Sequence, residues 1–334
     1  MKDKKTNKFA LITAVLALSA VLVCAGCKKE PEPDFDSLDS FGPSSIIEGL
    51  TVDNYPIVDG STSADPLKAV IACKLFGIRY KWAVDSQRLR YIKPNLDKNE
   101  TEAFQQLIKN SQTHESFIKL IDEEAELILV ARTMSPDEQT CADTKGVSLT
   151  ETPIALDALV FIINPANPIK SLTIKQIQDI YTCKITNWKE VGGKNADIIP
   201  YIRNTNSGSQ ELMEALVMKD LDMTDLPTNG YELVVINTML GAFDYVLHGT
   251  DGLCYTIYYY KEYMVTGAAV KSVAVNGIYP DKTTIGNKSY PYTAEVYAVI
   301  RSDLDTSSMA YKLYEWLQTK EGKQVISESG YVPN

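Results

Sequence analysis

The sequence predicts an α/β fold with two lobes, on three observations. From Tyr55 onward, short apolar runs, glycine or serine turns and amphipathic helical patterns alternate, as in α/β lobes built on sheets. The roughly 290 residues after residue 45 exceed the size at which one hydrophobic core usually stops growing. Three hydroxyl-rich turns follow predicted strands and open predicted helices, and ligands of α/β folds lie at the carboxyl ends of strands.

The first 26 residues have the pattern of an export signal. Four lysines precede a nearly continuous apolar run, residues 9–25, which ends at Cys24-Ala25-Gly26-Cys27. The run is shorter than a membrane-spanning helix normally needs, and small residues before a cysteine indicate processing rather than spanning. The pattern resembles a bacterial lipoprotein signal, so we expect lipid attached to Cys27 to hold the chain on the extracytoplasmic side of the cell membrane.

Residues 28–45 are rich in proline, serine and acidic side chains, so we expect a flexible tether over residues 27–48. Removal of residues 1–26, which hold four lysines and one aspartate, changes the formal charge from −10 to −13. Such an acidic chain is a poor binder of nucleic acid, which requires clustered lysine and arginine. It also repels free anions, so anion capture has to be local and short-range.

The expected elements follow in order along the chain. The predicted strands are residues 55–58, 127–131, 156–164, 198–202, 252–260 and 294–300. The predicted helices begin at Pro66, with an apolar stripe through Leu75, and then cover residues 102–110, 113–121, 174–181 and parts of 308–329. The long apolar run at 156–164 is the expected first crossing between lobes, and 294–300 is the return. The expected lobes are therefore 49–153 with 265–334, and 154–264.

Three turns, residues 60–63, 113–116 and 206–209, each place hydroxyl groups where a helix begins. Helix starts present free backbone N–H groups with partial positive charge, and hydroxyls add donors. Arg203, just before the third turn, offers a planar fork matched to two oxygens. The pattern therefore predicts an oxyanion site that needs no metal or cofactor. Each turn is also compatible with an ordinary N-cap, and Arg203 with a structural ion pair.

Five stretches carry a family resemblance that covers nearly all of residues 50–334. They are Tyr55–Ser63, Asp179–Gly193, Arg203–Gln210, Tyr255–Tyr260, and the pair Glu321–Gln324 and Gly330–Pro333. The chain resembles the phosphate-binding lipoproteins of ABC-type importers. The resemblance implies a monomer with the two-lobed periplasmic-binding-protein fold of the second type, which captures inorganic phosphate or a related tetrahedral oxyanion in the cleft between its lobes and delivers it to a membrane permease.

The resemblance also implies a set of ligand-binding residues. They are Thr62 and Ser63 in the first loop, Thr113 in the second, and Arg203, Ser207, Gly208 and Ser209 in the third, with Ser61 as a further candidate. One expected ligand is missing, because phosphate binders of this family place an Asp after the strand that here ends at Ala131-Arg132-Thr133. Such an acceptor binds the proton of hydrogen phosphate, which sulfate lacks.

Several residues keep two interpretations at this point. Arg132 is either a second cation for the ligand or the partner of an acidic side chain. Asp59 or Glu115 is either a replacement acceptor or a carboxylate satisfied by backbone N–H groups. A receptor with the same fold, acting as an anchored anion sensor or adhesin without transport, is the second functional reading.

An enzyme is the third class, and the sequence disfavours it. The chain has only two histidines, which is too few for most zinc sites and leaves few candidates for a histidine-based catalytic triad. The Ser-x-x-Lys pattern at Ser116–Lys119 has no Ser-Asp-Asn or Lys-Thr-Gly partner, so no catalytic residue is predicted. The tyrosines at 255 and 258–260 are more typical of packing than of a ligand platform. Four cysteines outside the signal leave disulfides and free thiols equally open: Cys73, Cys141, Cys183 and Cys254.

Overall fold

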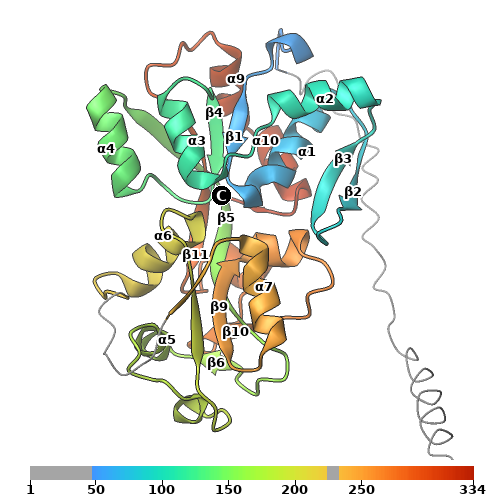
Figure 1. Ribbon diagram of the computed structural model, residues 1–334. Helices are drawn as coiled ribbons and strands as arrows, with labels where there is room; N and C mark the ends of the chain where they lie inside the picture. The colour runs from blue at the N-terminus through green and yellow to red at the C-terminus, as the bar shows by residue number, and fades with distance from the viewer. Residues whose placement is uncertain (1–46, 224–232) are drawn as a thin grey trace, which may run out of the picture. The chain divides into compact units, whose positions relative to one another are not determined.

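The computed structural model describes residues 47–223 and 233–334, and all of them belong to one compact unit of the chain (Figure 1). The predicted signal, Cys27 and nearly all of the predicted tether lie outside the described residues. Within the described ranges, no helix is both long and apolar enough to cross a membrane.

The centre of the fold is a mixed sheet of ten strands. Its main path runs β1–β4–β11–β5–β9–β7–β8, and β10, β6 and β12 branch from it. The bounds are β1 Val58–Gly60, β4 Leu127–Val130, β5 Leu149–Ile163, β6 Ser171–Leu172, β7 Ile199–Arg203, β8 Val234–Ile236, β9 Gly252–Ile257, β10 Lys271–Val275, β11 Thr293–Arg301 and β12 Val332–Pro333. A separate hairpin joins β2 Tyr80–Val84 to β3 Arg90–Pro94.

Strand β5 links the two parts of this sheet. Its residues 149–158 pair with β11, whose other edge pairs with β4, whereas residues 159–163 pair with β9. Figure 1 shows β5 and β11 running between the α1–α3–α4 part of the fold and the α5–α7 part. The predicted crossings at 156–164 and 294–300 both lie on these strands. β5 begins earlier than predicted because residues 149–153, which are half-buried or exposed and lack an apolar run, pair with β11.

The lobe boundary after residue 264 remains a prediction. β10 pairs with β5 at residues 161–163 and with β6, so residues 271–275 join the part of the sheet that holds β9.

The helices cover both parts of the sheet. Their bounds are α1 Asp65–Leu75, α2 Lys98–Leu107, α3 Gln112–Ile121, α4 Pro136–Lys145, α5 Ile174–Tyr181, α6 Gly208–Leu212, α7 Met239–His248, α8 Lys282–Gly286, α9 Met309–Trp316 and α10 Lys320–Glu328. α2 begins earlier than predicted because Asp97 and Glu100 form a capping box at its start. The sequence analysis omitted α4, α7 and α8.

A small apolar cluster fixes α3 against the sheet. Phe117 and Leu120, on the predicted apolar face, pack with Ile128 and Val130 of β4 and with Val299 of β11. Because these side chains are fully buried, the start of α3 is held at the end of β4. A second, larger cluster runs through both parts of the sheet and contains most of β5 and β9.

Candidate anion-binding site

The three predicted loops line one pocket of about 330 Å³. The first loop follows β1, the second precedes and opens α3, and the third joins β7 to α6. All seven predicted ligand residues and Ser61 line this pocket: Ser61, Thr62, Ser63, Thr113, Arg203, Ser207, Gly208 and Ser209. The predicted convergence of helix starts is therefore present in the structure.

The first loop depends on a glycine. Gly60 has φ 154°, and a Cβ at this position would lie 2.0 Å from the Leu129 carbonyl oxygen, since β1 pairs directly with β4 there. The Ser61 N–H then donates to the same carbonyl, and the Ser61 and Ser63 hydroxyl oxygens lie 3.3 Å apart. The tight approach places the buried Ser61 and Ser63 at the end of the strand.

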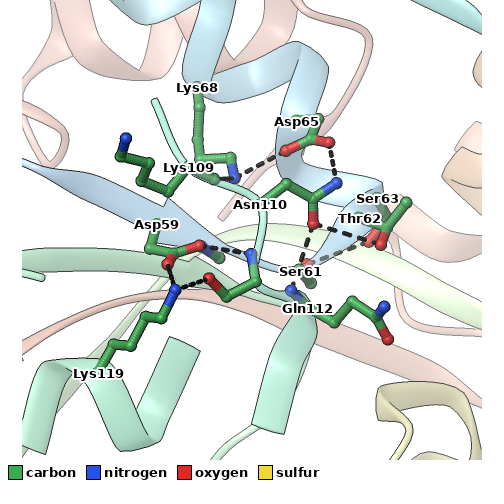
Figure 2. Close-up of polar contacts among 12 residues, drawn as sticks. Asp59, Ser61, Thr62, Ser63, Asp65, Lys68, Lys109, Asn110, Gln112 and Lys119 are labelled. Atoms are coloured by element: carbon green, nitrogen blue, oxygen red, sulfur yellow. Dashed lines mark hydrogen bonds and ion pairs between the residues drawn. The ribbon is translucent and has the colours of Figure 1, made fainter. Parts of the chain in front are cut away.

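A polar network ties the first loop to the second (Figure 2). The Asn110 amide donates to Asp65, and its carbonyl oxygen accepts from the Gln112 N–H at 3.3 Å and lies 3.5 Å from the Thr62 hydroxyl. Asp65 is also paired with the buried Lys68 at 2.7 Å. The carboxylates and cations of this region therefore satisfy one another and orient the two loops.

Asp59 has two interpretations from the sequence, and the structure places it inside this framework. Its Oδ1 accepts from the N–H groups of Gly60 and Ser111 at 2.7 and 2.8 Å, and Lys119 Nζ lies 4.0 Å from Oδ2. The side chain is fully buried and does not line the pocket. Asp59 is thus a strand-end carboxylate whose Oδ1 is satisfied by backbone N–H groups. The exposed Glu115, by contrast, lines the pocket.

Arg203 is buried, with 5 % of its surface exposed, at the base of the third loop. Its Nε donates to the Ile236 carbonyl at 2.9 Å, while Nη1 and Nη2 lie 3.4 Å from Ser209 Oγ and Asn204 Oδ1. None of the ion pairs found within residues 47–223 and 233–334 includes Arg203. Burial lowers the pKa of the guanidinium, yet arginine stays protonated in proteins. A buried cation without a carboxylate suits an anionic ligand.

The third loop brings α6 against α3. Ser207 caps α6 through the Gln210 N–H at 3.2 Å, and Asn206 before it has a positive φ of 65°. Gly208 lies against Thr113, because a Cβ at Gly208 would come within 2.6 Å of Thr113 Oγ1. Glycine therefore lets the starts of α3 and α6, from the two predicted lobes, meet at the pocket.

Arg132 points to a different partner. Its Nη1 and Nη2 each donate to one oxygen of the buried Glu138 at 2.7 Å, and the residue lines a neighbouring pocket. Only the preceding Ala131 lines the candidate site. The structure therefore favours an ion pair for Arg132, and the candidate ligand role has no geometric support.

Further residues line the pocket that the sequence did not name as ligands. They are Ser111, Gln112, His114, Ala131, Asn204, Thr205, Asn206, Met239 and Ile257. His114 and Asn206 lie inside the predicted turns, Ala131 stands where the missing Asp was expected, and most of the others adjoin the turns. Met239 and Ile257 gave no motif signal.

The tyrosine, Ser-x-x-Lys and cysteine residues singled out in the sequence lie outside the pocket. Tyr255 and Tyr259 are buried, and Tyr255 Oη accepts from the Arg203 N–H at 3.0 Å, so these rings pack and position the loop. Ser116 is buried and donates to the Thr113 carbonyl, while Lys119 donates to Ser111. The four cysteines are free thiols. Across the described ranges, no group of three or more potential metal ligands is assembled.

Helix starts and a buried arginine, without an ion pair among the described residues, line a polar pocket where the two parts of the sheet meet. This arrangement defines a two-lobed binding protein. The chain belongs to the periplasmic-binding-protein (PBP) superfamily, because residues 83–321 match a PBP superfamily domain. Its fold is that of type-2 periplasmic phosphate-binding proteins. An ABC-type phosphate transport receptor from Vibrio cholerae aligns with 82 % of this chain and 98 % of its own, with TM-score 0.57 and 22 % identity.

Sequence relatives carry similar names. The phosphate-binding protein PstS of Borreliella burgdorferi is 25 % identical over 193 residues, 54 % of this chain and 65 % of its own length. PstS of Bacillus subtilis is 24 % identical over 202 residues, 59 % of this chain and 61 % of its own length. The chain thus spans less than two thirds of the length of either relative. The names describe binding proteins rather than enzymes, as predicted.

Proposed function

We propose that this protein captures inorganic phosphate, or a related tetrahedral oxyanion, in the pocket between the three loops and delivers it to an ABC importer. The observation that carries the proposal is Arg203, a buried guanidinium with no carboxylate partner among the described residues, directed at hydroxyl-bearing helix starts. The names of the sequence relatives supply the choice of phosphate.

The strength of the available contacts is sufficient for such a ligand. Hydrogen bonds to charged groups contribute roughly 1.5 to 3 kcal/mol each, whereas micromolar affinity requires about 8 kcal/mol. At these values, about three to five charge-assisted hydrogen bonds would be enough. The pocket offers more donors than that: Arg203, the N–H groups of the helix starts, and the hydroxyls of Thr62, Ser63, Thr113 and Ser207. Surplus donors offset the entropy lost when the ligand and the loops become ordered.

Delivery requires that the protein stay near a membrane permease. The lysine-rich start, the apolar run and Cys27 support an extracytoplasmic lipid anchor, which the acidic tether would connect to the binding fold. Conversion of Cys27 to Ser should release the exported protein from the membrane fraction into the soluble extracytoplasmic fraction. A variant that stays with the membrane would refute lipidation at this residue.

Ala131 favours one second function. Ala131 stands where the family resemblance predicts an Asp, and loss of that Asp is compatible with a change of ligand. A protein with such a change would act as an anchored anion sensor or adhesin without transport. A transport role predicts that ligand closes the lobes and that the closed form binds permease subunits.

Calorimetric titration tests the proposal on the full chain, purified in detergent and stripped of ligand by unfolding and refolding. Phosphate and sulfate are titrated in turn at pH 6 and pH 8. Micromolar or tighter phosphate binding is the expected result. Arg88→Ala is the control variant and should bind phosphate as wild type does. The Arg88 side chain forms an exposed ion pair with Asp244, outside the pocket. Absence of phosphate binding at both pH values would refute the proposed ligand.

A further inference from the structure

The pocket lacks a carboxylate at the place where the family resemblance predicts one. Ala131 contributes a methyl group there. Asp59 is buried within the loop framework and does not line the pocket. Glu115 lines the pocket but is exposed to solvent. A site that prefers hydrogen phosphate to sulfate therefore needs its proton acceptor from another side chain.

His114 lines the pocket, and 27 % of its side chain is exposed. It lies in α3, two residues after Gln112, whose φ is positive. Its Nδ1 lies 3.0 Å from Oε1 of Glu138, which is fully buried. Glu138 is held from three further directions, by Arg132 Nη1 and Nη2 at 2.7 Å and by the Ser135 N–H at 2.8 Å. The imidazole is thus oriented by a carboxylate that is itself fixed.

This contact determines which ring nitrogen carries the proton. A carboxylate paired with arginine accepts hydrogen bonds and donates none, so Nδ1 of His114 must be the donor. In the neutral imidazole, Nε2 then has a free lone pair. Within the described part of the chain, no hydrogen bond is found to Nε2. The nitrogen left for a ligand is therefore an acceptor.

We propose that Nε2 of His114 accepts the proton of bound hydrogen phosphate and thereby sets the preference for phosphate over sulfate. The inference rests on the proposed function of the pocket. Sulfate has no proton to donate, so its oxygen would face the Nε2 lone pair without a hydrogen bond, at the cost of desolvating both groups. His114 acts here as a specificity-determining residue, with Glu138 positioning it.

A neutral acceptor suits this pocket better than the exposed Glu115. An ionised carboxylate beside a dianion adds repulsion, which the fixed donors of the site then have to offset. A neutral imidazole accepts the same proton without a second negative charge. Its orientation is also fixed by Glu138, whereas Glu115 has no hydrogen bond or ion pair found among the described residues that would hold it.

His114→Asn tests the inference. The Asn amide nitrogen can replace Nδ1 as the donor to Glu138, but nothing replaces Nε2. At pH 8, where most inorganic phosphate is the dianion, phosphate affinity should fall about tenfold while sulfate affinity stays within about twofold. The matched control is His248→Asn, since His248 is the other histidine of the chain, is exposed on α7 and lies outside the pocket.

Each calorimetric outcome has a distinct meaning. A selective loss of phosphate in His114→Asn, with His248→Asn unchanged, supports the inference. If wild type binds phosphate and His114→Asn keeps the same phosphate-to-sulfate ratio, the inference is overturned while the proposed function stands. If wild type binds no phosphate, both are overturned.

A spectroscopic measurement on the wild-type chain does not depend on the variant folding. With histidine labelled by ¹⁵N, the chain gives only two imidazoles, and His248→Asn assigns them. Saturating phosphate should move the Nε2 resonance of His114 in the direction of an accepted hydrogen bond, while Nδ1 stays protonated. No response of Nε2 to phosphate, or the same response to phosphate and sulfate, would overturn the inference.

Discussion

The loops after β1 and before α3 differ from the loop after β7 in how their charges are satisfied. In the first region Asp59 meets two backbone N–H groups, and Asp65 pairs with Lys68 and receives the Asn110 amide (Figure 2). In the second region, the Arg203 guanidinium has, among the described residues, one carbonyl acceptor at 2.9 Å and two weak contacts at 3.4 Å. Most charges of the first region are satisfied internally, although Asp59 Oδ2 accepts no hydrogen bond found among the described residues and lies 4.0 Å from Lys119 Nζ. The guanidinium of the second region has hydrogen-bonding capacity left for a ligand.

This difference distinguishes residues that orient the loops from residues that can bind a ligand. Buried charges that pair internally orient a loop, but they have little attraction left for a ligand. A buried guanidinium with long contacts is available for a short, charge-assisted bond to an oxyanion. We therefore expect substitutions in the first region to act mainly on loop order, and substitution of Arg203 to act directly on binding.

The largest effect is expected for Arg203→Ala. Loss of the one buried, unpaired cation found in the described pocket should weaken phosphate binding about a hundredfold or more, or roughly 3 kcal/mol, since charge-assisted contacts are the strongest in the site. Arg203→Lys should recover only part of the loss, because an ammonium cannot reproduce the planar fork. Calorimetry on folded variants measures both. An affinity within threefold of wild type in Arg203→Ala would erase the contrast between the two regions.

The strand that joins the regions is predicted to give the next effect, on stability. Asp157 lies in β5 and is buried. Its Oδ1 accepts from the N–H groups of Ala158 and Tyr259 at 2.8 and 3.0 Å, and Oδ2 has no hydrogen-bond partner within the described part of the chain. Burial raises the pKa of this carboxyl from 3.8 to about 7. A raised acid pKa stabilises the fold below about pH 4 and loses that stabilisation as the pH rises to about 7.

Asp157→Asn tests this linkage, because the amide oxygen keeps the Oδ1 contacts and cannot ionise. From pH 4 to pH 7.5 the free energy of unfolding of wild type should fall relative to the variant by a few kcal/mol, roughly 1.4 kcal/mol for each unit of pKa difference. Urea unfolding at several pH values measures the difference. Parallel pH profiles for the two proteins would show that Asp157 does not titrate in this range.

Sequence reasoning found the parts of the site that local rules determine. Glycine at position 60, hydroxyls at helix starts and an arginine after a strand each have a local physical reason, so the three loops could be predicted and lie together. The apolar run at 156–164 likewise indicated the strand that joins the sheet parts. These signals depend on residues that are neighbours in sequence.

The features that the sequence analysis missed depend on side-chain contacts, strand pairing and capping, which apolar periodicity does not report. Arg132 had two interpretations until the fold showed its ion pair with Glu138. His114 lies inside the predicted turn 113–116 but was not named as a ligand, and its hydrogen bond to the same glutamate became visible only in the structure. The first part of β5 and the offset of α2 followed from strand pairing and from a cap, neither of which apolar periodicity reports. No local pattern states which acid an arginine will meet.

A third substitution tests where the two regions meet. Gly208→Ala would place a methyl group 2.6 Å from Thr113 Oγ1, so the Thr113 side chain or the starts of α3 and α6 would have to shift. Phosphate affinity should fall about tenfold, because the donors of the two regions no longer reach one ligand together. When Thr113 is also replaced by Ala, the added methyl group should reduce phosphate affinity by a smaller factor. An equal loss of affinity with and without Thr113→Ala would mean that the contact between residues 208 and 113 does not limit how closely α3 and α6 approach.

The smallest effects are expected for single hydroxyls, and they sharpen the contrast. Ser207→Ala and Thr62→Ala each remove one neutral donor, so each should weaken phosphate binding by about threefold to tenfold, or roughly 1 kcal/mol. Ser207 also caps α6, whereas Thr62 contacts Asn110 in the framework. Ser207→Asn should therefore restore the cap and stability without restoring affinity. Full recovery of affinity in Ser207→Asn would show that the cap, rather than a bond to the ligand, is the role of this hydroxyl.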